Sequence, residues 1–205
     1  MTAEDLIGWV AAVLSAVWAF PQFLRIVRVR SIGGVSSRAW QATLWTGTAW
    51  TVYGVLTDRP QVIWCNLFMI TLTFLILHLV GRGSQVRWTV LWLPPLAGAS
   101  ATLGAWGTFG PVAFTVILAL PMLGAQSLHL RTAIVAADTT GLSIVALGVG
   151  SSSQALWAGY GWLTDSLPIL ALNVVGASLL AATILVATSR RRAVTNDSCG
   201  RSWPT

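Results

Sequence analysis

Apolar residues dominate seven stretches of this chain, and short polar segments rich in glycine or proline separate them. Each stretch is close to the ~20 residues that an α-helix needs to cross a bilayer. The pattern therefore predicts seven transmembrane helices, and the polar residues from Arg190 onward predict a disordered tail. The predicted helices cover residues 6–27, 39–57, 61–81, 88–105, 110–130, 141–163 and 167–188.

The composition supports a membrane protein. Apolar residues make up 55% of the 205 residues, whereas charged residues make up only 9%. A soluble domain carries roughly 25% charged residues, so this chain has too little charge to cover a surface that faces water. Its basic character comes from arginines that lie between apolar stretches, so membrane orientation explains them and a nucleic-acid partner is not expected.

The arginines fall almost entirely on one side of the predicted membrane. All 12 basic residues are arginines, and 11 of them lie in alternate connections or in the tail. The opposite side holds only Arg59, together with the acidic residues Glu4, Asp5, Asp58 and Asp165. The positive-inside rule then puts the N-terminus outside and the C-terminus in the cytoplasm, and we expect a multi-pass protein of the plasma membrane. Because the chain starts with acidic residues, we expect its first helix to be a mature span and not a cleaved signal peptide.

The strongest sequence signal is an internal repeat. Residues 34–66 and 141–173 align without gaps at an offset of 107, and ten of the 33 positions are identical, where chance gives roughly two. The identical pairs are Gly34/Gly141, Ser36/Ser143, Ala39/Ala146, Trp50/Trp157, Tyr53/Tyr160, Gly54/Gly161, Leu56/Leu163, Thr57/Thr164, Asp58/Asp165 and Asn66/Asn173.

The repeat predicts an all-α integral membrane protein in a 3+1+3 arrangement. Residues 1–84 form the first three-helix bundle, and residues 108–189 form the second. Because three is an odd number of spans, the linker helix in residues 85–107 restores the orientation, and the two bundles run parallel. Residues 190–205 form the predicted cytoplasmic tail.

This arrangement resembles the PQ-loop family and, within it, the SWEET sugar facilitators and their half-size bacterial relatives. The resemblance rests on a Pro-Gln pair late in the first helix, on a W-x-x-Y-G motif that begins at Trp50 and again at Trp157, and on an asparagine in the third helix of each unit. It covers roughly residues 6–188. It implies a passive transporter that works by alternating access.

Four repeated residues are predicted to lie at one depth in the membrane. Trp50 and Asn66 each lie eight residues from Asp58, and Trp157 and Asn173 stand in the same relation to the matching turn. At 1.5 Å per residue, all four lie ~12 Å below those turns, near the middle of a hydrocarbon core about 30 Å thick. Indoles offer flat apolar faces and carboxamides both donate and accept hydrogen bonds, so the set suits a neutral polyhydroxylated ligand. The alternatives are helix packing by the asparagines and an interfacial belt for the tryptophans.

Two tyrosines lie one helical turn closer to the predicted outer surface than the tryptophans. Tyr53 and Tyr160 share a helical face with the tryptophans three residues before them. The resemblance implies that this level forms the outer gate, where Asp58, Arg59 and Asp165 are placed to add a polar latch. The alternative is that the tyrosines are ordinary interfacial residues and the aspartates only cap the turns.

A proline late in the first helix is the candidate inner hinge. Pro21 cannot donate a backbone hydrogen bond to the carbonyl four residues earlier and loosens the helix there, and Gln22 can bond to the freed backbone. The resemblance implies that such prolines are hinges for the inner gate, and the alternative is a static kink. In the second unit, Leu128 and His129 stand at the matching positions, so the second hinge is either Pro121, about two turns earlier, or lost.

The sequence shows no catalytic motif and no acidic or basic residue at mid-membrane depth. No acidic or basic residue lies in the middle of a predicted helix, and His78 and His129 lie near cytoplasmic helix ends, where interfacial placement is simpler than a proton relay. No P-loop, metal-ligand cluster or serine triad is present, so we expect no enzyme activity, no cofactor and no metal.

We therefore expect a passive facilitator of a small neutral polar solute, a mono- or disaccharide. Two rival functions stay open. One is a proton-coupled amino-acid exporter of the PQ-loop class, in which Asp138 would carry the proton. The other is a non-transporting membrane receptor or scaffold. The sequence leaves open whether copies of the chain form a homo-oligomer.

Overall fold

The computed structural model describes the backbone of residues 2–29, 37–83, 86–136 and 142–200, and their side chains except those of residues 17–19, 21–23, 25–27, 29 and 193–200. Over these residues the chain forms seven α-helices and confirms the predicted number of helices. The helices are α1 (Ala3–Val29), α2 (Ser37–Leu56), α3 (Pro60–Gly83), α4 (Trp88–Phe109), α5 (Pro111–Val135), α6 (Ile144–Leu163) and α7 (Leu167–Gly200).

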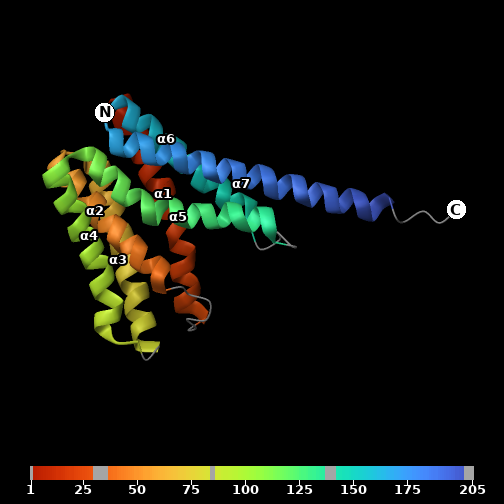
Figure 1. The fold of residues 1–205 in the computed structure, drawn as a ribbon, viewed down its shortest axis with the longest axis horizontal. Helices are drawn as coiled ribbons and strands as arrows, with labels where there is room; N and C mark the ends of the chain where they lie inside the picture. The colour runs from red at the N-terminus through yellow and green to blue at the C-terminus, as the bar shows by residue number, and fades with distance from the viewer. Residues whose placement is uncertain (1, 30–36, 84–85, 137–141, 201–205) are drawn as a thin grey trace.

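The helices form two units of the same design, as the repeat predicts. In the first unit α3 packs against both α1 and α2, and in the second unit α7 packs against both α5 and α6. The linker helix α4 packs against α2 of one unit and α5 of the other. The units meet where α1 packs on α6 and α2 packs on α5 (Figure 1). The 3+1+3 fold class is therefore confirmed.

The repeat also governs which residues are buried. The buried residues of α3 and of α7 each form a stripe at the three- and four-residue spacing of one helical face. Most buried positions of α3 have a buried counterpart 107 residues later in α7, although Leu72 and Leu77 correspond to the half-buried Leu179 and Ile184. The matched buried pairs include Val62/Ile169, Cys65/Leu172, Thr73/Leu180, Ile76/Thr183 and Val80/Ala187. Each unit therefore buries the same face of its middle helix.

The turns that end α2 and α6 are copies of one another. Asp58 has a φ of 52° and Asp165 a φ of 48°, in the left-handed region that aspartate enters more readily than most residues. The next residue donates its backbone N–H back to a glycine carbonyl: Arg59 to Gly54 at 2.8 Å, and Ser166 to Gly161 at 2.8 Å. This is the Schellman motif, which satisfies carbonyls at a helix C-terminus.

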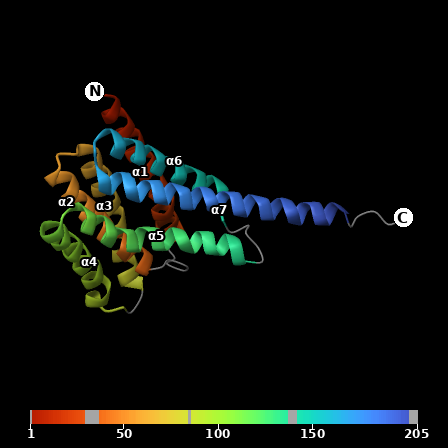
Figure 2. The same ribbon diagram turned by 45° about the horizontal axis from the view of Figure 1, so that its top comes forward.

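The two units meet at one end of the molecule and diverge toward the other. We call the end that carries Glu4, Asp5 and the turns at Asp58 and Asp165 the acidic end, and the opposite end, where α1, α3 and α5 finish, the arginine end. Figure 1 shows α5, α6 and α7 leaving the acidic end in a different direction from α1 to α4. The turned view in Figure 2 shows the same divergence.

Three of the described helices are long and apolar enough to cross a membrane by length and composition alone. They are Pro60–Gly83, Pro111–Val135 and Leu167–Arg192. Helices α2, α4 and α6 carry more tryptophan, glycine, serine and threonine, which lowers their mean hydropathy. Of these, α2 and α6 each pack against a helix of the other unit, where polar side chains find partners away from lipid.

The tail differs from its prediction. Residues 190–200, which the sequence predicts to be disordered, continue α7 as helix to Gly200. At the start of this extension Arg190 donates from Nη1 to the carbonyls of Ala133 and Ile134, at 2.8 and 2.9 Å. Those carbonyls belong to the last turn of α5, where helices leave acceptors unpaired. A polar composition therefore did not prevent helix formation here.

Candidate functional site

The structure brings each predicted tryptophan against the tyrosine of its own motif. Trp50 meets Tyr53 edge to face, with ring centroids 5.4 Å apart and an interplanar angle of 88°. Trp157 meets Tyr160 in the same way, at 5.6 Å and 88°. All four residues are buried. T-shaped aromatic pairs of this kind are stabilising, so both units hold their indoles in the same orientation on the helix.

The indole of Trp157 is tied to the other unit. Its Nε1 donates to Ser15 Oγ of α1 at 3.0 Å, and Ser15 Oγ lies 2.9 Å from Ser153 Oγ of α6. Sequence analysis did not identify either serine. Ser153 lies one turn before Trp157 on the same helical face, and this spacing is the signal that would have pointed to it.

The indole of Trp50 has apolar surroundings. It packs edge to face against Phe114 of α5, with centroids 5.4 Å apart at 82°. The residue of the second unit that corresponds to Ser15 is Met122, which packs against the same buried core. The two tryptophans therefore occupy equivalent positions with unlike neighbours.

The two asparagines make the same bond in each unit. Asn66 Nδ2 donates to the carbonyl of Val62 at 2.8 Å, and Asn173 Nδ2 donates to the carbonyl of Ile169 at 2.8 Å. Asn173 is buried, with 8% of its surface exposed, and Asn66 is half-buried. An amide that bonds its own helix costs less to bury, and its carbonyl oxygen and second N–H can still bind a ligand.

The two tyrosines close the acidic end by bonds between the units. Tyr53 OH lies 2.7 Å from Ser166 Oγ at the start of α7, and Tyr160 OH donates to Gln61 Oε1 of α3 at 3.2 Å. Tyr53 also stacks on Phe114, with centroids 5.2 Å apart. Each tyrosine therefore reaches from the second helix of its own unit to the other half of the molecule.

Arg59 adds a second tie at the same level. Its Nη2 donates to the carbonyl of Thr164 at 2.8 Å, and its guanidinium carbon lies 5.8 Å from the centroid of the Tyr160 ring, within the range of a cation–π contact. The ring of Tyr160 lies so close to Gly8 that an added Cβ would come within 2.8 Å of it. Arg59 and Tyr160 together fasten α1 and the first turn to the second unit.

A further residue of the first helix joins this closure. Gln61 Nε2 donates to Asp5 Oδ1 at 2.9 Å, so a chain of bonds runs from Asp5 through Gln61 to Tyr160. Hydrogen bonds from the backbone and side chain of Thr2 lower the pKa of Asp5. The carboxylate therefore stays a charged acceptor at neutral pH. Sequence analysis identified neither Gln61 nor Asp5 as part of this level.

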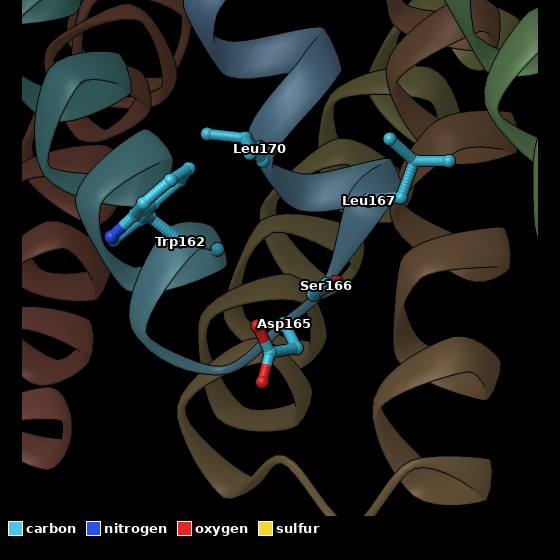
Figure 3. Close-up of a pocket in the computed structure, with 6 residues that line it drawn as sticks. Trp162, Asp165, Ser166, Leu167 and Leu170 are labelled. Carbon is cyan, nitrogen blue, oxygen red and sulfur yellow. The ribbon is translucent and has the colours of Figure 1, made fainter.

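The structure places the two turn aspartates differently from Arg59. Asp58 and Asp165 are exposed, and their left-handed backbone serves the Schellman turns. Within the described residues, neither carboxylate makes an ion pair or hydrogen bond across the units. Asp165 lines a shallow, mostly apolar hollow at the acidic end with Trp162 and Leu170 (Figure 3). The hollow lies at the surface of the acidic end, apart from the deeper level that holds the tryptophans and asparagines.

The candidate hinges are described only in part. The side chains of Pro21 and Gln22 lie outside the described residues, although helix α1 runs through both positions. Pro121 lies inside α5, which continues to Val135. Leu128 and His129, which stand where a second Pro-Gln pair would fall, are both exposed.

The arrangement suits binding of a neutral solute. Its groups are indoles, carboxamides and hydroxyls, which bind by flat apolar contact and by hydrogen bonds. Among the described residues, no group of three metal-ligating side chains occurs. The two units that carry these groups are fastened together at the acidic end and diverge beyond it.

Comparison with known proteins agrees with this geometry. Residues 5–80 match the profile of a family described as "Sugar efflux transporter for intercellular exchange". The chain is 32% identical over 83 residues to the sugar transporter SemiSWEET of Leptospira biflexa serovar Patoc, which is 40% of this chain and 98% of that relative. Its fold is similar to a structure of a eukaryotic SWEET transporter, with a TM-score of 0.68 and 15% identity over 92% of this chain and 98% of the other.

Proposed function

This chain belongs to the MtN3/SWEET family, and from that membership we propose that it is a passive transporter of small sugars. The family and the fold are those of membrane transporters, so the chain is an integral membrane protein. We further propose that it is not an enzyme and that it works by alternating access, exposing one central site to each side of the membrane in turn.

The observation that carries this proposal is the closure of one end by bonds between two similar units. Tyr53, Tyr160 and Arg59 each bond across the units at the acidic end, while the helices diverge toward the arginine end. Alternating access needs a two-state contact of this kind. Breaking these few bonds would let the acidic end open as the arginine end closes.

The proposed binding site is the level of the four repeated residues. Trp50 and Trp157 would contact the apolar faces of a sugar ring, and Asn66 and Asn173 would bond its hydroxyls with the amide groups that their own helices leave free. Tyr53, Arg59 and Tyr160 form the proposed outer gate. Asp58 and Asp165 support that gate through the geometry of the turns.

The proposed inner hinges are prolines, because a proline removes one backbone bond and lets a helix bend there. Pro21, with Gln22 beside it, would serve the first unit. In the second unit Pro121 is the candidate, since it lies inside α5.

The proposed orientation puts the acidic end outside the cell and the arginine end in the cytoplasm of a plasma-membrane protein. Cys65 is buried, so Cys199 in the tail is the thiol that a reagent would reach. A membrane-impermeant thiol reagent should label the protein only after the cells are permeabilised. Labelling of Cys199 in sealed cells would reverse the orientation and exchange the two gates.

The proposed function is tested by counterflow in liposomes. Purified protein should accelerate exchange of a radiolabelled mono- or disaccharide, and an imposed pH gradient should not drive net uptake. The double variant Asn66→Ala/Asn173→Ala is the control for leak. Amino-acid flux that requires a pH gradient would favour the exporter function instead. Absence of flux for every sugar and amino acid tested would contradict transport and favour a receptor or scaffold.

A further inference from the structure

Two glutamines of the second unit converge on one glycine of α7. Gln126 of α5 and Gln154 of α6 both point their side-chain oxygens at Gly176. A Cβ at Gly176 would lie 2.9 Å from Gln126 Oε1 and would collide with Gln154 Oε1. The residue must therefore be glycine for both amides to fit, and the two oxygens lie within about 5 Å of one another.

Neither oxygen has a hydrogen-bond partner among the residues that the structure describes. Gln126 Oε1 and Gln154 Oε1 are both buried, and neither accepts a hydrogen bond from any residue that the structure describes. A buried polar atom without a partner is costly, and native structures rarely tolerate one without a reason. Two of them side by side indicate a place that receives hydrogen-bond donors.

The place lies next to the proposed sugar site. Gly176 follows Asn173 by three residues, so both lie on one face of α7, and both are buried. Gln154 lies 11 residues before Asp165 and Gly176 lies 11 after it, so both are about 16 Å from the turn, against ~12 Å for Asn173. The glutamines are therefore roughly one helical turn nearer the arginine end than the tryptophans and asparagines.

The matching positions of the first unit carry no amides. At an offset of 107, the counterparts of Gln126, Gln154 and Gly176 are Ala19, Gly47 and Met69. The counterpart of each amide is thus a residue with no side-chain polar atom. The repeat supplies the shared level of four residues, and the glutamine pair is an addition of the second unit alone.

We propose that Gln126 and Gln154 form a second sugar subsite, which makes the chain a carrier of disaccharides bound in one orientation. The inference rests on the proposed function. One ring would occupy the level of Trp50 and Trp157, and the second would extend along α7 toward the arginine end. The hydroxyls of the second ring would donate to the two amide oxygens. These oxygens lie roughly one helical turn along α7 from Asn173, a distance comparable to that between the centres of two linked pyranose rings.

A pair of glutamines that only packed α5 and α6 against α7 would behave differently. Such a pair would affect folding, and therefore the transport of every solute to the same degree. A subsite for the second ring affects only solutes that have a second ring. Selectivity between a monosaccharide and a disaccharide is thus the readout that separates the two roles.

The experiment measures glucose and sucrose counterflow in liposomes for the parent and for Gln126→Met and Gln154→Met, which keep side-chain length and remove the amide. We expect glucose exchange within twofold of the parent, and an apparent affinity for sucrose weakened about five- to tenfold by each substitution, the loss of one neutral hydrogen bond. Gln41→Met is the matched control, because Gln41 Nε2 bonds the carbonyls of Val90 and Leu91 away from the site.

Each result is decisive. Equal loss for both sugars, or no change for either, would overturn the subsite. A parent that exchanges glucose but no disaccharide would also overturn it and leave the proposed function intact. A parent that exchanges no sugar would contradict the proposed function itself. If Gln154→Met does not fold, Gln126→Met alone tests the subsite, because the Gln126 side chain lies farther from Gly176 and its replacement disturbs the packing less.

Discussion

The two units of this molecule share the same frame, meaning their helix arrangement and internal contacts, but differ in the side chains that they place against one another. Their turns, tryptophan–tyrosine pairs and asparagine bonds match position by position, and so do most residues of their buried stripes. Around that frame the residues differ: Ser15 corresponds to Met122, Arg59 to Ser166 and Gln61 to Pro168. The bonds that match lie within a unit, whereas the differing residues include the partners that Tyr53, Tyr160 and Trp157 meet in the other unit.

This difference indicates which residues stay identical in the two copies of a repeat. A contact inside a unit is reproduced when the unit is duplicated, so the same selection acts on both copies. A contact between the units joins two different surfaces, as when Tyr53 meets Ser166 while Tyr160 meets Gln61. The copies are free to change there, and the proposed site lies at that boundary.

The largest effect is expected where the shared frame is tightest. An added Cβ at Gly161 would lie 2.5 Å from the backbone N of Leu170, whereas one at Gly54 would meet the Ile63 side chain at 2.9 Å and its backbone N only at 3.2 Å. A side chain can move and a backbone cannot. Gly161→Ala should therefore cost about 3 kcal/mol of folding free energy and Gly54→Ala about 1 kcal/mol.

Thermal melting in detergent measures both glycine variants on the same scale. Equal losses would mean that the two helix junctions are equally tight and would remove this difference between the units.

The asparagines test whether the two copies still act together on the ligand. Asn66→Ala and Asn173→Ala should each lose a hydrogen bond to sugar worth about 1–3 kcal/mol, and therefore roughly five- to hundredfold in affinity. The controls are Thr71→Ala and Ser178→Ala, which also lose a bond to the carbonyl four residues earlier but are exposed. Near-normal sugar affinity in either asparagine variant would assign that residue to helix packing.

The prolines test whether both units bend. Pro21→Ala and Pro121→Ala each restore a helix bond worth about 1 kcal/mol, and alanine is roughly 3 kcal/mol better than proline inside a helix. Each variant should melt no lower than the parent, keep its ligand affinity and exchange sugar more slowly. Melting temperature, affinity and counterflow rate are measured on one preparation. A Pro121→Ala variant with the parental rate would confine the hinge to the first unit.

The smallest effect concerns the tryptophans. Trp157→Phe removes the bond to Ser15 and should cost about 1 kcal/mol of stability beyond the loss caused by Trp50→Phe, because Phe114 packs on Trp50 through ring contact alone. A double-mutant cycle with Ser15→Ala should show coupling for Trp157 and additivity for Trp50. Coupling of the same size at both tryptophans would mean that their surroundings do not differ in energy.

Sequence reasoning predicted this shared frame because its features leave patterns along the chain. Apolar length predicted all seven helices, and ten identities at a fixed offset predicted the two units. The bond between Trp157 and Ser15 joins residues 142 positions apart, and no local pattern carries that information. Likewise, the pattern could not tell that Arg59 spans the units while Asp58 provides the left-handed turn, because the two roles depend on backbone conformation.

The linker helix has a consequence for how such a molecule can change. Because α4 connects α3 to α5 within one chain, pairing of the halves is intramolecular and does not depend on protein concentration. A chain of one unit would have to pair with its own copy, and every substitution at its two-fold interface would appear twice. Here a residue such as Gln154 can arise on one side without its mirror image. Covalent linkage thus removes the requirement for two-fold symmetry at the interface. Each unit can then acquire the residues that fit its own side of an asymmetric ligand.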